Sequence, residues 1–166
     1  ALVVYANLLT GLCLLPVAII RFEGLPQLSP ILFSLYLLSV VAWALFGYIY
    51  NLALKVTPVS TFTIITQLQV VLITLLGLTI LKHPFSPGLI IGVLLICSAS
   101  ILVTYTKGSR QELTRKGVFL SLLTSVCGAT AIFTDSILIK YFEPFFYGTT
   151  IIIFSTLPLL FLYRFK

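Results

Sequence analysis

Charge is what this sequence has least of. Only 8% of its 166 residues are Asp, Glu, Lys or Arg, whereas 60% are hydrophobic, and the mean hydropathy is +1.18. A soluble domain carries about 25% charged residues, because water has to solvate its surface. The composition therefore excludes a soluble globular domain and predicts an integral membrane protein, whose first partner is the lipid bilayer.

Side chains for hydrolytic, metal and nucleotide chemistry are also scarce. The chain has one His, four acidic residues and no GxxxxGK[ST] loop for nucleotide phosphates. Its three cysteines, Cys13, Cys97 and Cys127, lie in apolar segments without CxxC or Cys/His spacing, which is typical of packing residues. We therefore expect no enzyme activity, no metal site and no cofactor. The net charge of +6 is assigned to loop anchors at the membrane surface and not to a nucleic-acid partner.

Six apolar segments are long enough to cross a bilayer as helices, which takes about 20 residues each. Lipid offers no partner for backbone N–H and C=O groups, so each segment is expected to be helical, and none alternates polar and apolar residues as a β-barrel strand does. We predict an all-α, polytopic transmembrane helix bundle. The six spans are 1–20, 31–54, 58–81, 88–106, 117–139 and 145–163.

Proline placement agrees with these boundaries. Four prolines stand at the first turn of a predicted helix, where a missing N–H costs nothing: Pro30, Pro58, Pro87 and Pro144. Two others, Pro16 and Pro158, lie within spans, and each is expected to kink its helix.

These two prolines belong to a faint internal repeat. YANLLTGLCLLP at 5–16 is echoed by YGTTIIIFSTLP at 147–158, and an Arg-Phe pair follows each copy. The interval between the starts of the two copies, from residue 5 to residue 147, matches the length of five helices with their loops, at about 28 residues each. An odd number of crossings inverts the second copy, and inverted repeats are typical of secondary transporters.

The repeat predicts the domain organisation. Residues 1–106 would hold helices two to five of a first repeat, 107–116 the loop between repeats, and 117–166 the first two helices of a second repeat. The chain opens on Ala1 inside an apolar run and has no Met, so we expect a fragment with one helix before it and three after it.

Several motifs follow one another in a recognisable order. ALKVTP at 53–58 leads into an apolar helix, LKHPFSP at 81–87 is a short polar turn after it, and GLIIG at 88–92 opens the next helix. This order resembles the drug/metabolite transporter superfamily, EamA type, and Lys116-Gly117 resembles the start of that family's second repeat. Many members also have a proline near the position of Leu68, which this chain lacks.

The resemblance implies a ten-helix fold of two inverted five-helix repeats, of which this chain covers helices two to seven. It also implies a multi-pass protein of the inner (plasma) membrane that moves small metabolites, often amino acids or their relatives, commonly outward. We therefore predict a secondary active transporter that works by alternating access, with protons as a candidate coupling ion. The alternative is a non-transporting membrane scaffold or sensor subunit.

Polar residues inside a bilayer are costly, so their arrangement indicates where a substrate binds. Segment 58–81 carries Ser60, Thr63, Gln67 and Thr74 along one helical face. These side chains either line a wet cavity or hydrogen-bond neighbouring helices and their own backbone. The cavity is favoured for Gln67, whose amide is hard to satisfy within its own helix, and the second interpretation is favoured for the threonines.

Segment 31–54 places Trp43, Tyr50 and Asn51 on one face. Aromatic residues otherwise gather at the ends of spans, as in 141–147, which is typical of interfacial belts. Trp43 lies in mid-span, where it either packs in the bundle or forms an aromatic wall of the cavity.

Asp135 is the one acidic residue within a predicted span, five positions before Lys140. Three interpretations stay open. The carboxylate can reach headgroups or water at the membrane boundary, it can pair with Lys140, or it can act as a proton carrier or a counter-charge for a substrate ammonium group.

Overall fold

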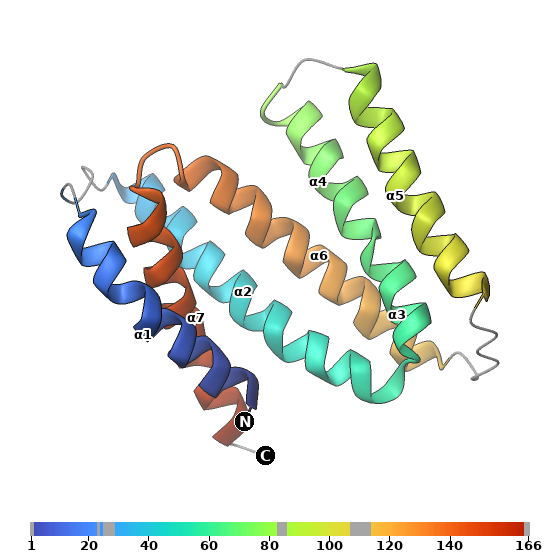
Figure 1. The fold of residues 1–166 in the computed structure, drawn as a ribbon, viewed down its shortest axis with the longest axis horizontal. Coiled ribbons are helices and arrows are strands. Elements are labelled where there is room, and N and C mark those ends of the chain that lie inside the picture. Colours follow the sequence, from blue (N-terminus) through green and yellow to red (C-terminus); the bar gives the residue numbers. More distant parts are fainter. Residues whose placement is uncertain (1, 23, 25–28, 83–85, 107–113, 165–166) are drawn as a thin grey trace. The chain divides into compact units, whose positions relative to one another are not determined.

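The structure, a computed structural model, describes residues 2–22, 24, 29–82, 86–106 and 114–164. Every regular element in this part of the chain is a helix, which confirms the predicted all-α class (Figure 1). Residues 83–85 of the predicted polar turn and 107–113 of the predicted inter-repeat loop lie outside the described residues. The helices are α1 (Leu2–Ile20), α2 (Pro30–Val56), α3 (Val59–Thr66), α4 (Leu68–Thr79), α5 (Pro87–Thr106), α6 (Arg115–Leu138) and α7 (Pro144–Arg164).

The described helices are those of a polytopic membrane protein. Four segments are long and apolar enough to cross a membrane: Pro30–Val56, Val59–Thr79, Arg115–Leu138 and Pro144–Phe161. Two of the six predicted spans correspond to shorter apolar helices within the described residues, Val4–Ile20 and Pro87–Ala99. Length and composition therefore confirm a multi-pass helical bundle.

Proline fixes where several helices begin. Pro30, Pro87 and Pro144 are the first residues of α2, α5 and α7, and Pro58 is the N-cap of α3. The ring sets φ near the helical value, and the missing N–H would have had no helical acceptor there. Pro16 and Pro158 lie inside α1 and α7, as the sequence indicates. The kinks expected at these two positions stay a prediction.

The span predicted as one helix over 58–81 is interrupted at Gln67, which separates α3 from α4. The Val70 N–H donates to the Gln67 carbonyl oxygen at 3.0 Å. This bond joins residues three positions apart instead of the four of an α-helix, so the turn here is a tighter 3₁₀ turn. The Thr66 hydroxyl donates to the carbonyl oxygens of Phe62 and Thr63, each at 3.0 Å. Such bonds from a side chain to the preceding turn bend helices.

Cα positions divide the chain into two compact units, which are described separately. Unit 1 comprises Ala1–Tyr48 and Ala131–Lys166, and unit 2 comprises Ile49–Thr130. Helices α2 and α6 each contribute to both units.

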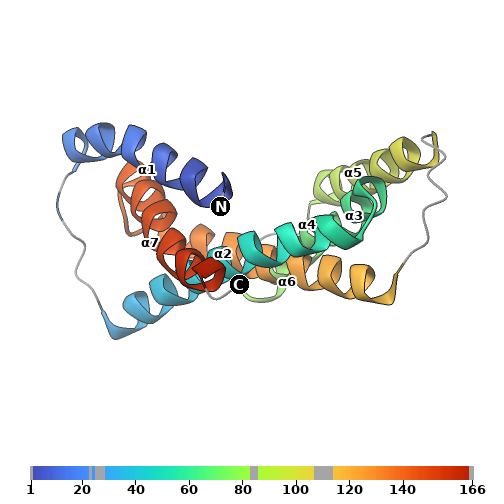
Figure 2. The same ribbon diagram turned by 90° about the horizontal axis from the view of Figure 1, so that it is seen from below.

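In unit 1, α1 packs along α7, the two helices that carry the echoed prolines (Figure 2). The approach depends on Gly11, because a Cβ at this position would lie 2.7 Å from Cγ1 of Ile153. The main core of this unit joins α2, the end of α6 and α7. Its buried members are Val40, Leu138, Phe142, Tyr147 and Ile151.

In unit 2, the end of α2 meets the start of α6. The Thr114 hydroxyl donates to the Val56 carbonyl oxygen at 3.2 Å and accepts the Gly117 N–H at 3.2 Å, which caps α6. A Cβ on Gly117 would lie 2.5 Å from Oγ1 of Thr57. That Oγ1 atom is buried and makes no hydrogen bond to another described residue.

Thr57→Val is therefore expected to leave the free energy of unfolding unchanged or to raise it by up to about 1 kcal/mol, because it removes an unpaired hydroxyl and keeps the shape of the side chain. Thermal unfolding in detergent micelles, followed by circular dichroism, measures the change. Thr124→Val is the matched control, since the buried Thr124 hydroxyl donates to the Leu120 carbonyl oxygen at 2.8 Å. A larger loss in Thr57→Val than in the control would contradict the unpaired state of the Thr57 hydroxyl.

Candidate functional site

Helices α2, α6 and α7 converge on one carboxylate, that of Asp135. Asp135 lies on α6 less than one turn before its end at Leu138. Ser39 and Trp43 are four positions apart on α2, so they share a face. Tyr147 lies in the first turn of α7, where the Phe146 N–H donates to the Glu143 carboxylate at 2.6 Å and fixes the start of the helix.

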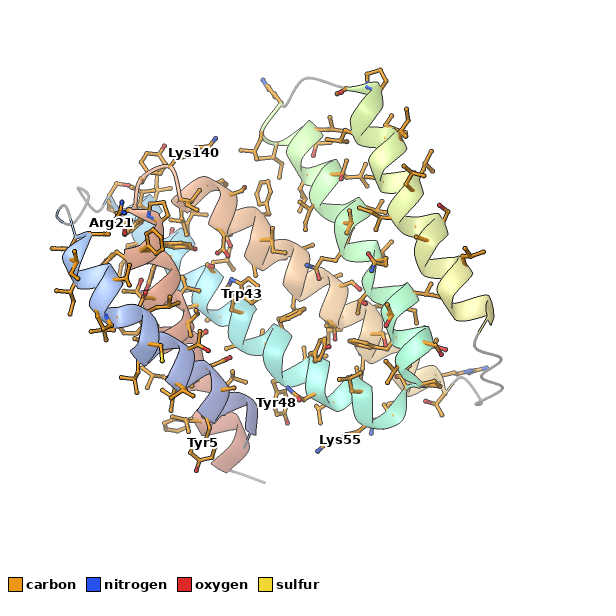
Figure 3. All side chains as sticks on the ribbon, in the orientation of Figure 1. Tyr5, Arg21, Trp43, Tyr48, Lys55 and Lys140 are labelled. Atoms are coloured by element: carbon orange, nitrogen blue, oxygen red, sulfur yellow. The ribbon has the colours of Figure 1, made fainter. Side chains whose placement is uncertain are left out.

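The four side chains form one hydrogen-bonded group, which we call the Asp135 cluster (Ser39, Trp43, Asp135 and Tyr147). Oδ1 of Asp135 accepts the Ser39 hydroxyl at 2.5 Å and the Tyr147 hydroxyl at 2.6 Å. Oδ2 accepts the indole Nε1–H of Trp43 at 2.8 Å. Trp43 projects from α2 toward α6 (Figure 3). The carboxylate is therefore held by donors from two other helices.

The two residues that donate to Oδ1 are buried, whereas Asp135 itself is only half-buried. Ser39 is 0% exposed and Tyr147 4%, whereas Asp135 and Trp43 are half-buried. The Tyr147 ring packs 5.7 Å from the ring of Phe142 and 6.1 Å from that of Tyr36. One side of the carboxylate is thus backed by the aromatic core of unit 1.

The carboxylate has no cationic partner among the described residues. The three groups that bond it are all neutral, and Lys140 is exposed beyond the end of α6 (Figure 3). The sequence left three interpretations of Asp135 open, and one of them was an ion pair with Lys140. The described residues do not form this pair. The cluster therefore holds a carboxyl group without a described cation beside it, and burial of such a group in its ionised form is costly unless hydrogen bonds offset it.

The structure brings two of the predicted cavity residues together, Trp43 and Asp135, in unit 1. The others lie in unit 2, where each is described by itself, and their common role as a cavity lining stays a prediction. They are Tyr50 and Asn51 on α2, Ser60 and Thr63 on α3, and Gln67 at the break between α3 and α4.

The residues of unit 2 differ in how their polar groups are used. Thr63 donates to the Val59 carbonyl oxygen at 2.8 Å, and Thr74 donates to that of Val70 at 2.9 Å, so both threonines bond their own backbone. The Gln67 side chain is half-buried, and its backbone N–H donates to the carbonyl oxygens of Thr63 at 3.3 Å and Ile64 at 3.1 Å. The Tyr50 ring meets the Phe62 ring edge-on at 4.9 Å.

The sequence did not predict two members of the Asp135 cluster, Ser39 and Tyr147. Ser39 precedes Trp43 by four positions, and that spacing alone would have placed both on one face. Tyr147 was assigned to an interfacial belt, but its hydroxyl turns inward to Asp135 across the short connection between α6 and α7. The short connection was the available signal, because it makes the two helices antiparallel neighbours.

Comparison with protein families gives a match to the EamA-like transporter family over residues 1–105, which is more than half of the chain. The matched region includes Ser39 and Trp43 and ends before α6 and α7. A search of curated proteins and a search of solved structures each returned no match.

Proposed function

The chain belongs to the EamA-like transporter family, and on this premise we propose that it is a secondary active exporter of small organic metabolites, such as amino acids or related compounds, in the plasma membrane. Membership makes it a multi-pass membrane transporter of the drug/metabolite transporter type. The substrate class, the outward direction of transport and the location in the plasma membrane are what we propose in addition.

The observation that carries the proposal is the ionisable side chain of Asp135 within a membrane-spanning helix, where three neutral donors bond it. An ionisable side chain in a span is costly and usually marks a substrate or ion pathway. Neutral side chains can join three helices at lower cost, as interhelical hydrogen bonds in other membrane bundles do. The uncompensated carboxylate therefore supports transport over a purely structural role.

Alternating access between two inverted five-helix repeats is the proposed mechanism, driven by a proton or solute gradient. The packing of α1 on α7 supports it, because helices related by a two-fold axis can meet at that axis. These helices carry the two copies of the repeated segment, 5–16 and 147–158.

Solute flux in proteoliposomes containing the full-length protein tests the proposal. We expect efflux of a labelled amino-acid mixture, reduced about tenfold or more in Trp43→Ala and in Gln67→Ala, because each loses a group proposed to contact the solute. Ser98→Ala is the matched control, since its hydroxyl bonds the Leu95 carbonyl oxygen of its own helix at 3.0 Å. Its flux is expected to equal that of the unaltered protein.

The outcomes separate the functions. Absence of flux in the unaltered protein would favour the scaffold or sensor subunit. Normal flux in both Trp43→Ala and Gln67→Ala would leave transport standing and remove these residues from the solute path.

A further inference from the structure

We propose that Asp135 is the recognition site for an ammonium group, which donates to its Oδ2 atom, so that the transported solutes are small organic cations and zwitterions. This inference rests on the proposed transport function and names its substrate class. Three observations on the Asp135 cluster carry it.

The first is the unused acceptor capacity of the carboxylate. A carboxylate oxygen can accept about two hydrogen bonds. Oδ1 has two donors, Ser39 and Tyr147, whereas Oδ2 has one, Trp43, among the described residues. One acceptor position therefore remains on Oδ2, on the half-buried side of the cluster.

The second is the sign of the charge. The cluster supplies three neutral donors and no cation from the described residues. A positive group that reaches Oδ2 would neutralise the carboxylate where the surroundings screen charge weakly, and an anionic group would be repelled. The cluster is therefore selective for cationic groups over neutral and anionic ones.

The third is that the carboxylate is already oriented. Ser39 and Trp43 hold it from α2 and Tyr147 holds it from α7, so both oxygens are fixed before a solute arrives. A preoriented acceptor loses little conformational freedom on binding, which favours affinity for a small ligand.

Trp43 supplies a direct reporter, because its Nε1–H bonds the atom to which the ligand is assigned and it is the one Trp among the 166 residues. The full-length protein in detergent is titrated at constant pH with n-butylammonium, 1-butanol or butanoate. Subtraction of the Trp43→Phe spectrum isolates the emission of Trp43. We expect a saturable emission change with n-butylammonium and none with the other two probes.

Asp135→Asn is the decisive variant. An amide keeps the size of the side chain, its oxygen can accept the Trp43 N–H, and its NH₂ can donate to the hydroxyl oxygens of Ser39 and Tyr147. The fold is therefore retained, which circular dichroism checks, while the charge is lost. We expect the affinity for n-butylammonium to fall by about 10- to 100-fold, as for hydrogen bonds to charged groups. Ser98→Ala is expected to bind as the unaltered protein does.

Three results would overturn the inference: no saturable response to n-butylammonium, an equal response to 1-butanol, or unchanged affinity in Asp135→Asn. A response to acidification alone, with none to the amine, would likewise assign the site to a proton. The proposed function fails separately. If n-butylammonium binds but proteoliposomes move no solute, the site stands without transport; if Asp135→Asn exports amines and neutral solutes normally, transport stands without the site.

Discussion

Asp135→Leu is expected to lower the free energy of unfolding by about 2–4 kcal/mol, whereas Asp135→Asn is expected to change it by less than about 1 kcal/mol. Leucine removes the acceptor of three donors, two of which belong to the buried residues Ser39 and Tyr147. The Ser39 and Tyr147 hydroxyls already lie 3.3 Å apart and can still bond each other, so one bond is recovered and the indole N–H of Trp43 is left unpaired. Thermal unfolding in detergent micelles measures the difference.

Ser136→Ala is the control for this comparison. Ser136 follows Asp135 on α6, and its hydroxyl donates to the Phe133 carbonyl oxygen of the same helix at 2.7 Å, so little should be lost. An equal loss in Asp135→Leu and Asp135→Asn would assign the stabilisation to the charge instead of the acceptor. No loss in Asp135→Leu would show that the three donors have other partners.

The division of the chain into helices was predictable from sequence because it depends on local chemistry. Apolar length sets where a span lies, and proline sets where it begins, as at Pro30, Pro87 and Pro144. Neither signal needs knowledge of a neighbouring helix. The same local chemistry singled out Trp43 and Asp135, since an indole in mid-span and an acidic residue near the end of a span each stand out against an apolar background.

The interruption at Gln67 could not be predicted in the same way. The segment has no proline or glycine at this point, and its polar residues follow a helical face that gives no sign of a break. What interrupts it is a set of polar contacts: the Thr66 hydroxyl on two carbonyl oxygens, and the Ser125 hydroxyl of α6 on the Ile65 carbonyl oxygen at 3.0 Å. The second contact joins residues 60 positions apart, a distance that one sequence does not encode as a local pattern.

The pairing of Trp43 with Asp135 has the same limit. The two residues are 92 positions apart, and helical periodicity specifies a face but not the helix that the face meets. Tyr147 lies only 12 positions from Asp135, and there the difficulty was chemical. Its neighbours Phe145 and Tyr141 are exposed, as an interfacial belt requires, while Tyr147 itself is buried with its hydroxyl on a carboxylate. In sequence, a tyrosine near a helix end fits an exposed interfacial position and a buried hydrogen-bonded position equally well.

Gly117→Ala is expected to lower the free energy of unfolding by about 1–3 kcal/mol, although alanine is the better helix former by about 1 kcal/mol. A Cβ at this position would lie 2.5 Å from Oγ1 of Thr57 and 3.0 Å from the Val56 carbonyl oxygen. The carbonyl oxygen belongs to the backbone and cannot rotate away, so the end of α2 and the start of α6 have to separate. Because the Thr114 hydroxyl bonds both Val56 and Gly117, that separation also strains the cap of α6.

A double variant tests whether Thr57 is the obstacle. Thr57→Ala removes the nearest contact of the added Cβ and leaves that with the Val56 carbonyl oxygen. Gly117→Ala combined with Thr57→Ala is therefore expected to regain part of the stability lost by Gly117→Ala alone, an interaction that a double-mutant cycle measures. Gly148→Ala on α7 is the matched control, since a Cβ there meets nothing within 4 Å and alanine should keep or raise stability. Equal stability of Gly117→Ala and Gly148→Ala would show that α2 and α6 do not approach this closely in the membrane.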